Sequence, residues 1–395
     1  MTDSRPKVLL IATHPIQYHV PWFRELAGAP DIDFSVLFVD LPDAQQQGKG
    51  FGVAFKWDIP MLEGYRWQQV PERTGRGGLD GFFATRVVQP VALLKSLAPD
   101  VLILTGWQAY PLLQFLAAGR WLKIPVIMRG ESNALRQRSY KVRFLHRQLL
   151  RQCAAFLTIG QANRAFYLGY GTTPEQLFDT SYFVENQRFV DATQRFLPER
   201  SALRSRWNIP DTATCFCYAG KLEPKKRVLD LLRALQLASA RGSALLHLLV
   251  VGTGELMSEA QAMVKAQGLP VTFAGFLNQT EIAAAYVATD CLVLPSDFGE
   301  TWGLVVNEAM ACGRPAIVSD RVGCGADLIQ PGVTGEMFPF GDTAALAEHM
   351  LGMAAKPDRV REMGRAAQAL VLAKYTVERA AEGTLAAIRH VLRGR

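Results

Sequence analysis

An alternation of short apolar runs with longer amphipathic segments limits the fold of this 395-residue sequence more than any other feature. The apolar runs of the first half are Lys7 to Ala12, Phe34 to Val39, Val101 to Leu104, Pro125 to Met128 and Phe156 to Ile159. Segments of helical periodicity, such as Val20 to Ala27 and Pro111 to Leu122, lie between several of them. Strands that alternate with helices form parallel, doubly wound sheets. The sequence therefore predicts an α/β fold.

A second series of the same kind begins near Cys215. Its apolar runs are Thr214 to Ala219, Leu245 to Val251, Val271 to Ala274, Cys291 to Leu294 and Ala316 to Ser319. A chain of this length exceeds one ordinary hydrophobic core. We therefore predict two facing Rossmann-like domains, 1–190 and 191–375, joined by a linker near Val184 to Pro198. Ligands of such sheets bind at the carboxyl ends of the strands, so a deep interdomain cleft is the expected site.

Composition narrows the class of protein. Hydrophobic residues make up 49% and charged residues 20% of the chain, as in ordinary globular proteins. No apolar run approaches the roughly 20 residues that span a bilayer, and the six cysteines show no metal-like spacing, so we expect a reduced, cytoplasmic protein. The net charge is +7, and residues 1–190 hold 21 Lys and Arg against 15 Asp and Glu. This basic half would suit an anionic membrane surface, an acidic substrate or nucleic acid.

The stretch 296–313 carries the clearest chemical pattern. It follows the apolar run from Cys291, contains a glycine-bearing loop, and continues into a segment of good helix propensity that Gly313-Arg314-Pro315 ends. The amides near Gly303 would be free at the amino end of that helix, which makes an anion site. Glu300 and Glu308 would flank this anion site. Such an arrangement suits a sugar diphosphate, with phosphate at the helix end and hydroxyl groups on the carboxylates.

The run Glu300, seven residues, Glu308 and then Ala-Met-Ala-Cys-Gly resembles the signature of family 4 retaining glycosyltransferases with the GT-B fold. The His-Pro-Ile-Gln-Tyr run that starts at His14 resembles a bacterial subgroup of this family. The resemblance implies a metal-independent retaining hexosyltransferase of cell-surface polysaccharide or glycolipid synthesis. It would move a sugar from a UDP- or GDP-sugar to a saccharide or lipid-linked acceptor, without a cofactor. The last helix, about 376–395, would pack back onto the domain formed by 1–190.

Two lysines match the cationic positions of that family. Relatives carry Gly-Arg at a strand end and a lysine five residues later, and both cations contact the donor diphosphate. Here Lys221 takes the arginine position and Lys226 matches the lysine. A lysine keeps the charge but lacks the planar fork of a guanidinium. With the helix end, these two ammonium groups would stabilise charge on the leaving diphosphate without a metal.

The resemblance also implies how the other donor groups are held. Glu300 would hold sugar hydroxyl groups and Glu308 the ribose diol, whereas backbone groups of the segment that follows Val271 would read the base. The remaining donor-binding positions are Gly220, Gly275, Phe276, Leu277, Thr301, Trp302, Gly303, Leu304 and Val305.

The N-terminal half departs from the family pattern. Many relatives place a His-Gly pair after the strand that ends at Met128, and that histidine touches the donor sugar, whereas here Arg129 precedes the glycine. Arg129 or Glu131 would assume the contact. His14 and Gln17 would face the cleft and contact the diphosphate or the acceptor; the alternative is that the neighbouring Tyr18 and His19 cap and pack the first helix. We expect residues 41–81 to form a long loop over the acceptor side.

A basic segment, 135–151, contains no acidic residue. Its cations are Arg136, Arg138, Lys141, Arg143, Arg147 and Arg151, and its apolar face would hold Leu135, Val142, Leu145 and Leu149. Such a helix suits peripheral attachment to an anionic membrane, here the inner face of the plasma membrane. A helix packed on the core with a solvated basic side would show the same pattern.

Two other functions compete with sugar transfer. A nucleotide-sugar epimerase shares the GT-B architecture, but it would need an acid/base pair and would turn over the donor without an acceptor. A nucleic-acid-binding protein would use the basic half and show salt-sensitive affinity. The sequence lacks interleaved aromatic and basic residues, so we expect no nucleic acid partner.

Overall fold

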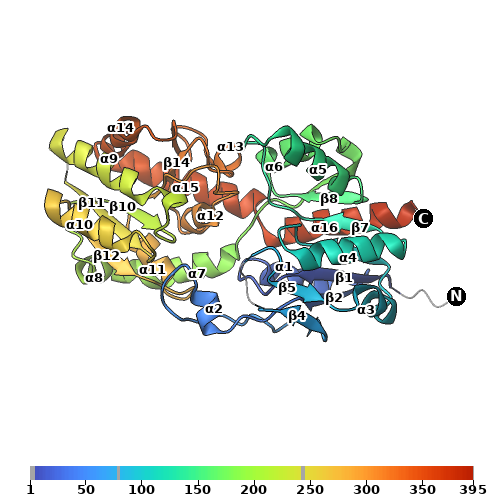
Figure 1. Cartoon of the computed structure of the whole chain (residues 1–395). Helices are drawn as coiled ribbons and strands as arrows, with labels where there is room; N and C mark the ends of the chain where they lie inside the picture. Colours follow the sequence, from blue (N-terminus) through green and yellow to red (C-terminus); the bar gives the residue numbers. More distant parts are fainter. Residues whose placement is uncertain (1–4, 78–80, 242–244, 395) are drawn as a thin grey trace. The chain divides into compact units, whose positions relative to one another are not determined.

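The computed structural model describes residues 5–77, 81–241 and 245–394. It divides into two compact units. Unit 1 comprises Met1–Gln47, Pro60–Tyr182 and Val377–Arg395, and unit 2 comprises Gly48–Ile59 and Phe183–Thr376. Each unit contains a parallel sheet with helices around it (Figure 1). The predicted α/β class with two doubly wound parallel sheets is confirmed.

The sheet of unit 1 has seven strands in the order β3-β2-β1-β6-β7-β8-β9, all parallel. The strands are β1 (Lys7–Ala12), β2 (Asp33–Phe38), β3 (Trp67–Gln69), β6 (Val101–Leu104), β7 (Val126–Met128), β8 (Ala155–Thr158) and β9 (Leu177–Asp179), with an antiparallel pair β4 (Arg73–Gly75) and β5 (Thr85–Val87). Val8 to Ile11 are at most 3% exposed, because helices cover both faces of a parallel sheet. The edge strands β3 and β9 were not predicted, because they contain polar, partly exposed residues in place of a continuous apolar run.

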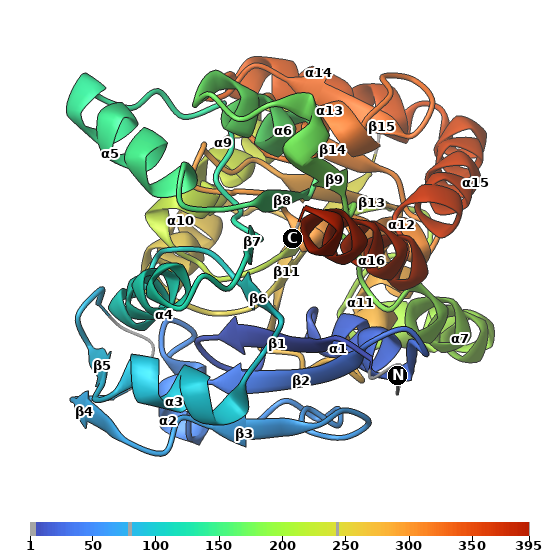
Figure 2. The ribbon, with the colours of Figure 1, turned by 90° about the vertical axis from the view of Figure 1, so that its right-hand side faces the viewer.

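The helices of unit 1 include one from the far end of the chain. They are α1 (Val20–Gly28), α3 (Pro90–Leu97), α4 (Tyr110–Trp121), α5 (Tyr140–Leu150), α6 (Gln161–Gly169) and α16 (Val377–Arg393), and α2 (Ala44–Gly48) ends where unit 2 begins. Helix α16 lies against α1, β8 and β9 (Figure 2). The buried Trp22 indole donates a hydrogen bond to the hydroxyl of Thr384 at 3.2 Å, which ties α1 to α16.

The sheet of unit 2 has six parallel strands in the order β12-β11-β10-β13-β14-β15. They are β10 (Thr214–Ala219), β11 (Leu246–Val251), β12 (Val271–Gly275), β13 (Cys291–Leu294), β14 (Ala316–Ser319) and β15 (Gly335–Phe338). Its helices are α7 (Asn186–Phe196), α8 (Arg200–Arg206), α9 (Val228–Arg241), α10 (Met257–Gln267), α11 (Ile282–Ala288), α12 (Leu304–Ala311), α13 (Gly325–Leu328), α14 (Thr343–Ala354) and α15 (Pro357–Lys374). The strand order reverses between β10 and β13, and ligands of doubly wound sheets bind outside the carboxyl ends at such a point.

Two segments differ from their predicted structure. The expected linker near Val184 to Pro198 contains helix α7, which belongs to unit 2. Phe189 of α7 is fully buried, and the Asn186 amide donates to the carbonyls of Val371 and Tyr375 at 3.2 and 2.9 Å. A helix anchored in this way packs as part of the unit rather than linking two units.

The expected loop over residues 41–81 is the second difference. It contains α2, β3 and β4, and its residues 48–59 belong to unit 2, the unit that carries the predicted donor-binding residues. Residues 78–80 lie outside the described part. Among the residues that the structure describes, no helix combines the length and apolar character needed to cross a bilayer.

Candidate active site

The loops that follow β10 and β13 lie side by side and bring two predicted residues into contact. Lys226, in the loop after β10, forms an ion pair with Glu300, in the loop after β13. The Asp297 amide donates to the Lys225 carbonyl at 2.9 Å and joins the two backbones. Both side chains of the ion pair are partly buried, at 15% and 14% exposed. The structure therefore places a cation and a carboxylate together at the carboxyl edge of the sheet.

Helix α12 begins beside this ion pair. Its N-cap, Gly303, has φ 103°, a conformation that favours glycine, and a Cβ there would lie 2.7 Å from a methyl group of Leu294. The loop that precedes α12 is held by the turn after β14, where the Gly323 amide donates to the Glu300 carbonyl at 3.1 Å. The predicted helix start is confirmed, and its first amides and helix dipole present positive charge next to Lys226 and Glu300.

Lys221 lies at the end of β10. The Tyr218 hydroxyl donates to the Lys221 carbonyl at 2.8 Å and fixes the turn. The Lys221 Nζ donates to the Lys49 carbonyl at 3.2 Å. The side chain of Lys226, in the same loop, extends back toward Gly220. A Cβ on Gly220 would lie 4.0 Å from the Nζ of Lys226. Both predicted lysines thus stand above the point where the strand order reverses.

Two predicted donor-binding side chains are enclosed. Glu308 is 2% exposed and accepts a hydrogen bond of 2.7 Å from the Tyr286 hydroxyl. Trp302 is also 2% exposed, and its indole donates to the Asn307 amide oxygen at 2.8 Å. A donor contact at Trp302 would therefore come from its backbone. Sequence analysis did not identify Tyr286, which donates to Glu308 from the neighbouring helix α11.

The predicted base-reading segment closes β12. Gly275 has φ 73°, and its carbonyl accepts from the Gly252 amide at 2.7 Å. The Phe276 ring packs on Phe51 and Phe55, which belong to the 48–59 segment of unit 2. The segment predicted to read the base is therefore flanked by rings from residues 48–59, which we had predicted to lie in a loop over the acceptor side.

Arg129, in unit 1, has a setting different from the predicted contact with a sugar. Its side chain is 1% exposed, and its guanidinium carbon lies 5.2 Å from the Trp22 ring centroid and 4.7 Å from that of Tyr182. Its Nη1 donates to His19 Nε2 at 3.0 Å. Arg129 is thus an enclosed cation in contact with two aromatic rings, and of the two predicted alternatives Glu131 is the one exposed to a ligand.

Glu131 is the accessible member of this cluster. Its side chain is 37% exposed, its Oε1 lies 3.7 Å from Arg129 Nη1, and it accepts a hydrogen bond from the Tyr182 hydroxyl. Burial and the adjacent Arg129 hold the pKa of His19 well below its usual value, so His19 accepts from Arg129 as a neutral ring. Sequence analysis missed Tyr182. His19 occupies the N-cap position of α1 without a side-chain capping bond, and its buried ring packs on Trp22 and Phe23, so the packing part of the alternative interpretation is confirmed.

His14 lines a cavity of about 380 Å³ in unit 1, together with Thr13, Asp40, Phe82, Thr85 and Gln108 among others. Burial lowers the pKa of His14 to about 4, although the negative charge of Asp40 acts to raise it. A neutral imidazole in a polar cavity can exchange hydrogen bonds with a hydroxyl group. Gln17 lies in the turn between β1 and α1, is half-buried and is not part of the cavity wall.

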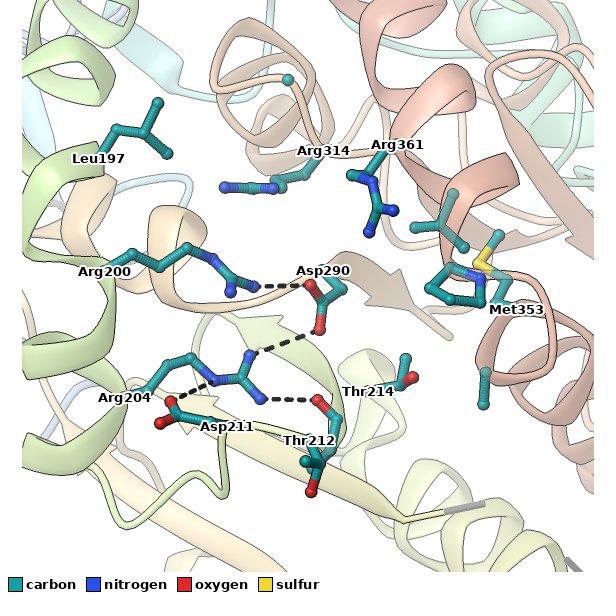
Figure 3. A pocket seen from close by; sticks show the side chains of 15 residues that line it. Leu197, Arg200, Arg204, Asp211, Thr212, Thr214, Asp290, Arg314, Met353 and Arg361 are labelled. Carbon is teal, nitrogen blue, oxygen red and sulfur yellow. Dashed lines mark hydrogen bonds and ion pairs between the residues drawn. The ribbon is translucent and has the colours of Figure 1, made fainter. Parts of the chain in front are cut away.

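A larger cavity of about 420 Å³ lies at the opposite, amino edge of the unit 2 sheet (Figure 3). Its arginines contact the carboxyl end of α11: Arg200, Arg204 and Arg314 donate to the last carbonyls of that helix at 2.9 to 3.1 Å. Asp290 accepts from Arg200 at 2.7 Å and lies 3.5 Å from Arg204. These guanidinium groups cap a helix, so we place the candidate site at the other edge.

Comparisons with known proteins show which family the sequence of unit 2 resembles. Residues 199–370 match the family described as "Glycosyl transferases group 1". The chain is 29% identical over 193 residues to N-acetyl-alpha-D-glucosaminyl L-malate synthase of Bacillus anthracis, a match over 48% of this chain and 49% of that protein. It is 34% identical over 188 residues to the GDP-mannose-dependent alpha-mannosyltransferase of Mycobacterium tuberculosis, over 47% of this chain and 44% of that one. The chain spans about half the length of the curated relatives it matches.

A solved structure extends the likeness to both units. The Anabaena protein HepE in complex with UDP and glucose superposes with a TM-score of 0.72 over 98% of this chain and 100% of that one, at 15% identity. At this identity the likeness shows the fold, which is GT-B.

Proposed function

We propose that the protein is a glycosyltransferase acting on cell-surface glycans, since its residues 199–370 match the glycosyl transferases group 1 family. It would transfer a sugar from a UDP- or GDP-sugar to a saccharide or lipid-linked acceptor. One observation carries the proposal: Lys221, Lys226, Glu300 and the amino end of α12 converge where the strand order of the unit 2 sheet reverses.

The ion pair between Lys226 and Glu300 is compatible with a site that binds a charged substrate. Without donor, each group neutralises the other. A bound diphosphate would offer Lys226 two negative charges, and Glu300 would then be released to accept hydrogen bonds from sugar hydroxyl groups. Because the charge on the diphosphate grows as the sugar–phosphate bond breaks, the fixed ammonium groups and the helix end would stabilise the transition state more than the ground state.

We further propose that transfer retains the anomeric configuration and needs no metal. Two lysines and a helix dipole supply the positive charge that a divalent ion would otherwise provide. Retaining enzymes of the resembling family are thought to use the leaving phosphate as the base, so no side-chain base would be required. The acceptor would use the His14 cavity of unit 1, whose neutral imidazole can bind hydroxyl groups.

Helix α5 supports a membrane-bound acceptor. Tyr140 is 82%, Phe144 52% and Leu145 64% exposed, whereas His146 packs on the Trp107 and Phe166 rings at 5.6 and 5.9 Å. The helix is therefore anchored to unit 1 by one side and presents apolar and basic side chains on another. This exposure favours the membrane interpretation over a core-packed helix, and we propose docking on an anionic leaflet.

Thermal unfolding in the presence of UDP, GDP and ADP tests the donor class. The nucleotide that binds should raise the free energy of unfolding by about 2.7 kcal/mol at 100 times its dissociation constant. Stabilisation by none of the three, or equally by unrelated anions such as sulfate, would contradict the assignment of the site.

Glu300→Gln tests the chemistry, with the exposed Glu259→Gln on α10 as the matched control. Loss of the carboxylate should lower sugar transfer by about 100-fold or more while the melting temperature stays close to that of the wild type. Donor turnover in the absence of any acceptor, with an epimeric sugar as product, would instead favour an epimerase.

Vesicle flotation tests the membrane contact. The protein should bind vesicles that contain phosphatidylglycerol and not vesicles of phosphatidylcholine alone, and Phe144→Ser with Leu145→Ser should abolish binding without loss of transfer to a water-soluble acceptor. Equal flotation of the wild type and the double variant would contradict the role of α5.

A further inference from the structure

The chain leaves unit 1 after Gln47 and returns to it at Pro60, and the twelve residues between, which we call the strap (Gly48–Ile59), belong to unit 2. The far end of the strap is held by side chains that follow β12. The side-chain amide of Asn278 donates to the Lys56 carbonyl at 2.8 Å. The backbone amide of Thr280 donates to the Asp58 carboxylate at 3.2 Å. The strap is thus fastened to the loop that carries the predicted base-reading residues.

Aromatic rings join the middle of the strap to the same loop. The Phe55 ring lies 4.3 Å and the Phe51 ring 5.1 Å from the Phe276 ring, and Trp57 packs on Phe55 at 4.8 Å. Phe55 is 9% exposed. Contacts at these distances are stabilising beyond the area they bury, so the strap holds Phe276 in place.

The near end of the strap holds Lys221. The Lys221 ammonium donates to the Lys49 carbonyl at 3.2 Å and lies 4.9 Å from the Phe51 ring centroid, within the range of a cation–π interaction. Gly50 has φ 87°, and a Cβ there would lie 2.8 Å from Lys221 Nζ. The positive φ favours glycine at this position, and the absence of a Cβ leaves room for the ammonium beside the strap backbone.

From these contacts we propose that the strap is a positioning element of the donor site, and that Phe51 acts through Lys221. This inference rests on the proposed function, in which Lys221 binds the donor diphosphate. A lysine side chain loses much rotamer freedom when it binds a phosphate. Because the strap already confines the ammonium, less freedom remains to be lost on binding. The strap therefore raises donor affinity and leaves the bond-breaking step unchanged.

Hydrogen exchange without any nucleotide tests the contact itself. Lys221→Ala should speed exchange of the amides of residues 48–59 by about two- to five-fold, the change that corresponds to the loss of one exposed cation–π contact. Lys265→Ala, an exposed lysine of the same unit, is the control and should leave these amides unchanged. Equal exchange in the Lys221 variant and the wild type would overturn the contact.

A double-mutant cycle tests its consequence for the donor. Phe51→Leu keeps the bulk of the side chain but removes the ring face. This variant should bind the stabilising nucleoside diphosphate about two- to five-fold more weakly. Its KM for the donor should rise while kcat stays unchanged. Phe51→Tyr, which keeps the ring, should restore the wild-type values. In the Lys221→Ala background, Phe51→Leu should have no further effect.

Each other result has a distinct meaning. Additive effects of the two substitutions would show that Phe51 does not act through Lys221, and tighter nucleotide binding by Phe51→Leu would show that the strap blocks the site; either overturns the proposal. If the wild type binds no nucleoside diphosphate, the proposed function and the donor role of the strap both fail. The exchange experiment still decides in that case whether the strap holds Lys221.

Discussion

The two edges of the unit 2 sheet are both rich in cations, yet they differ in what those cations contact. At the carboxyl edge, Lys226 pairs with a single carboxylate and Lys221 rests on a carbonyl and a ring. At the amino edge, Arg204 donates to three carbonyls and lies beside Asp290 (Figure 3). A phosphate can replace one exchangeable partner of a lysine, whereas an arginine that left three carbonyls to bind a phosphate would lose three hydrogen bonds at once. The amino-edge cavity is therefore not the better candidate site.

The strongest test of this comparison is Lys226→Ala at the carboxyl edge. Under the proposed function this removes a fixed charge from beside the leaving diphosphate, so turnover should fall by about 100- to 1,000-fold. The free energy of unfolding in urea should stay within about 1 kcal/mol of the wild type, because the ion pair is only partly buried. Steady-state kinetics and urea unfolding would measure both quantities, with Lys265→Ala as the control. If the turnover of Lys226→Ala stayed within a few-fold of the wild type, the carboxyl edge would not be distinguished from the amino edge as the catalytic one.

Arg204→Met at the amino edge should do the reverse. Arg204 is 2% exposed, and its loss leaves the carbonyls of Ala288, Pro210 and Ala213 without this donor. We expect the free energy of unfolding to fall by about 3–5 kcal/mol, while the nucleotide affinity of the folded protein stays unchanged. Arg206→Met, on the exposed side of α8, is the matched control. A loss below about 1 kcal/mol would show that Arg204 is dispensable for capping.

The amino edge should also make stability depend on pH through His247. Burial and Arg204 lower the pKa of this histidine from 6.5 to about 4, so between these pH values the unfolded chain binds a proton that the folded chain does not. Its contribution is complete above pH 6.5 and is lost as the pH falls toward 4.

His247→Gln, a neutral substitute, should therefore reduce the loss of stability over this pH range by about 1–2 kcal/mol once solvent screening is considered. Urea unfolding at a series of pH values measures the difference. Parallel pH profiles for the variant and the wild type would contradict the pKa shift.

The smallest effect should come from Arg361→Gln at the rim of the amino-edge cavity. Its guanidinium forms an ion pair with Asp358 one turn away on an exposed stretch of α15, and such pairs contribute less than about 1 kcal/mol. Neither stability nor turnover should change measurably. If millimolar inorganic phosphate stabilised the wild type and Arg361→Gln removed that effect, the amino edge would bind anions after all, and the contrast between the two edges would fail.

Sequence patterns predicted the parts of the fold that repeat. Strands β1, β6, β10, β13 and β14 have the predicted bounds, because an apolar run buried on both faces is readable without knowledge of its neighbours. The helix start at Leu304 was predictable for a similar reason: Gly303 and the residues after it act locally. The edge strands β3 and β9 were missed because they include polar residues and lack a continuous apolar run, and the helix α7 was missed because its segment was interpreted as a linker.

By itself, the sequence determined the local motifs that contain Lys221, Lys226, Glu300 and the α12 amino end, and the proposal of donor binding starts from these motifs. Only the tertiary structure decided what surrounds them. Arg129 is enclosed by rings from distant segments, Glu308 is oriented by Tyr286 of another helix, and Lys221 is held by a strap more than 160 residues away in the chain. The physical reason is that burial and hydrogen-bond partners depend on segments brought together by folding, and a local pattern contains no information about them.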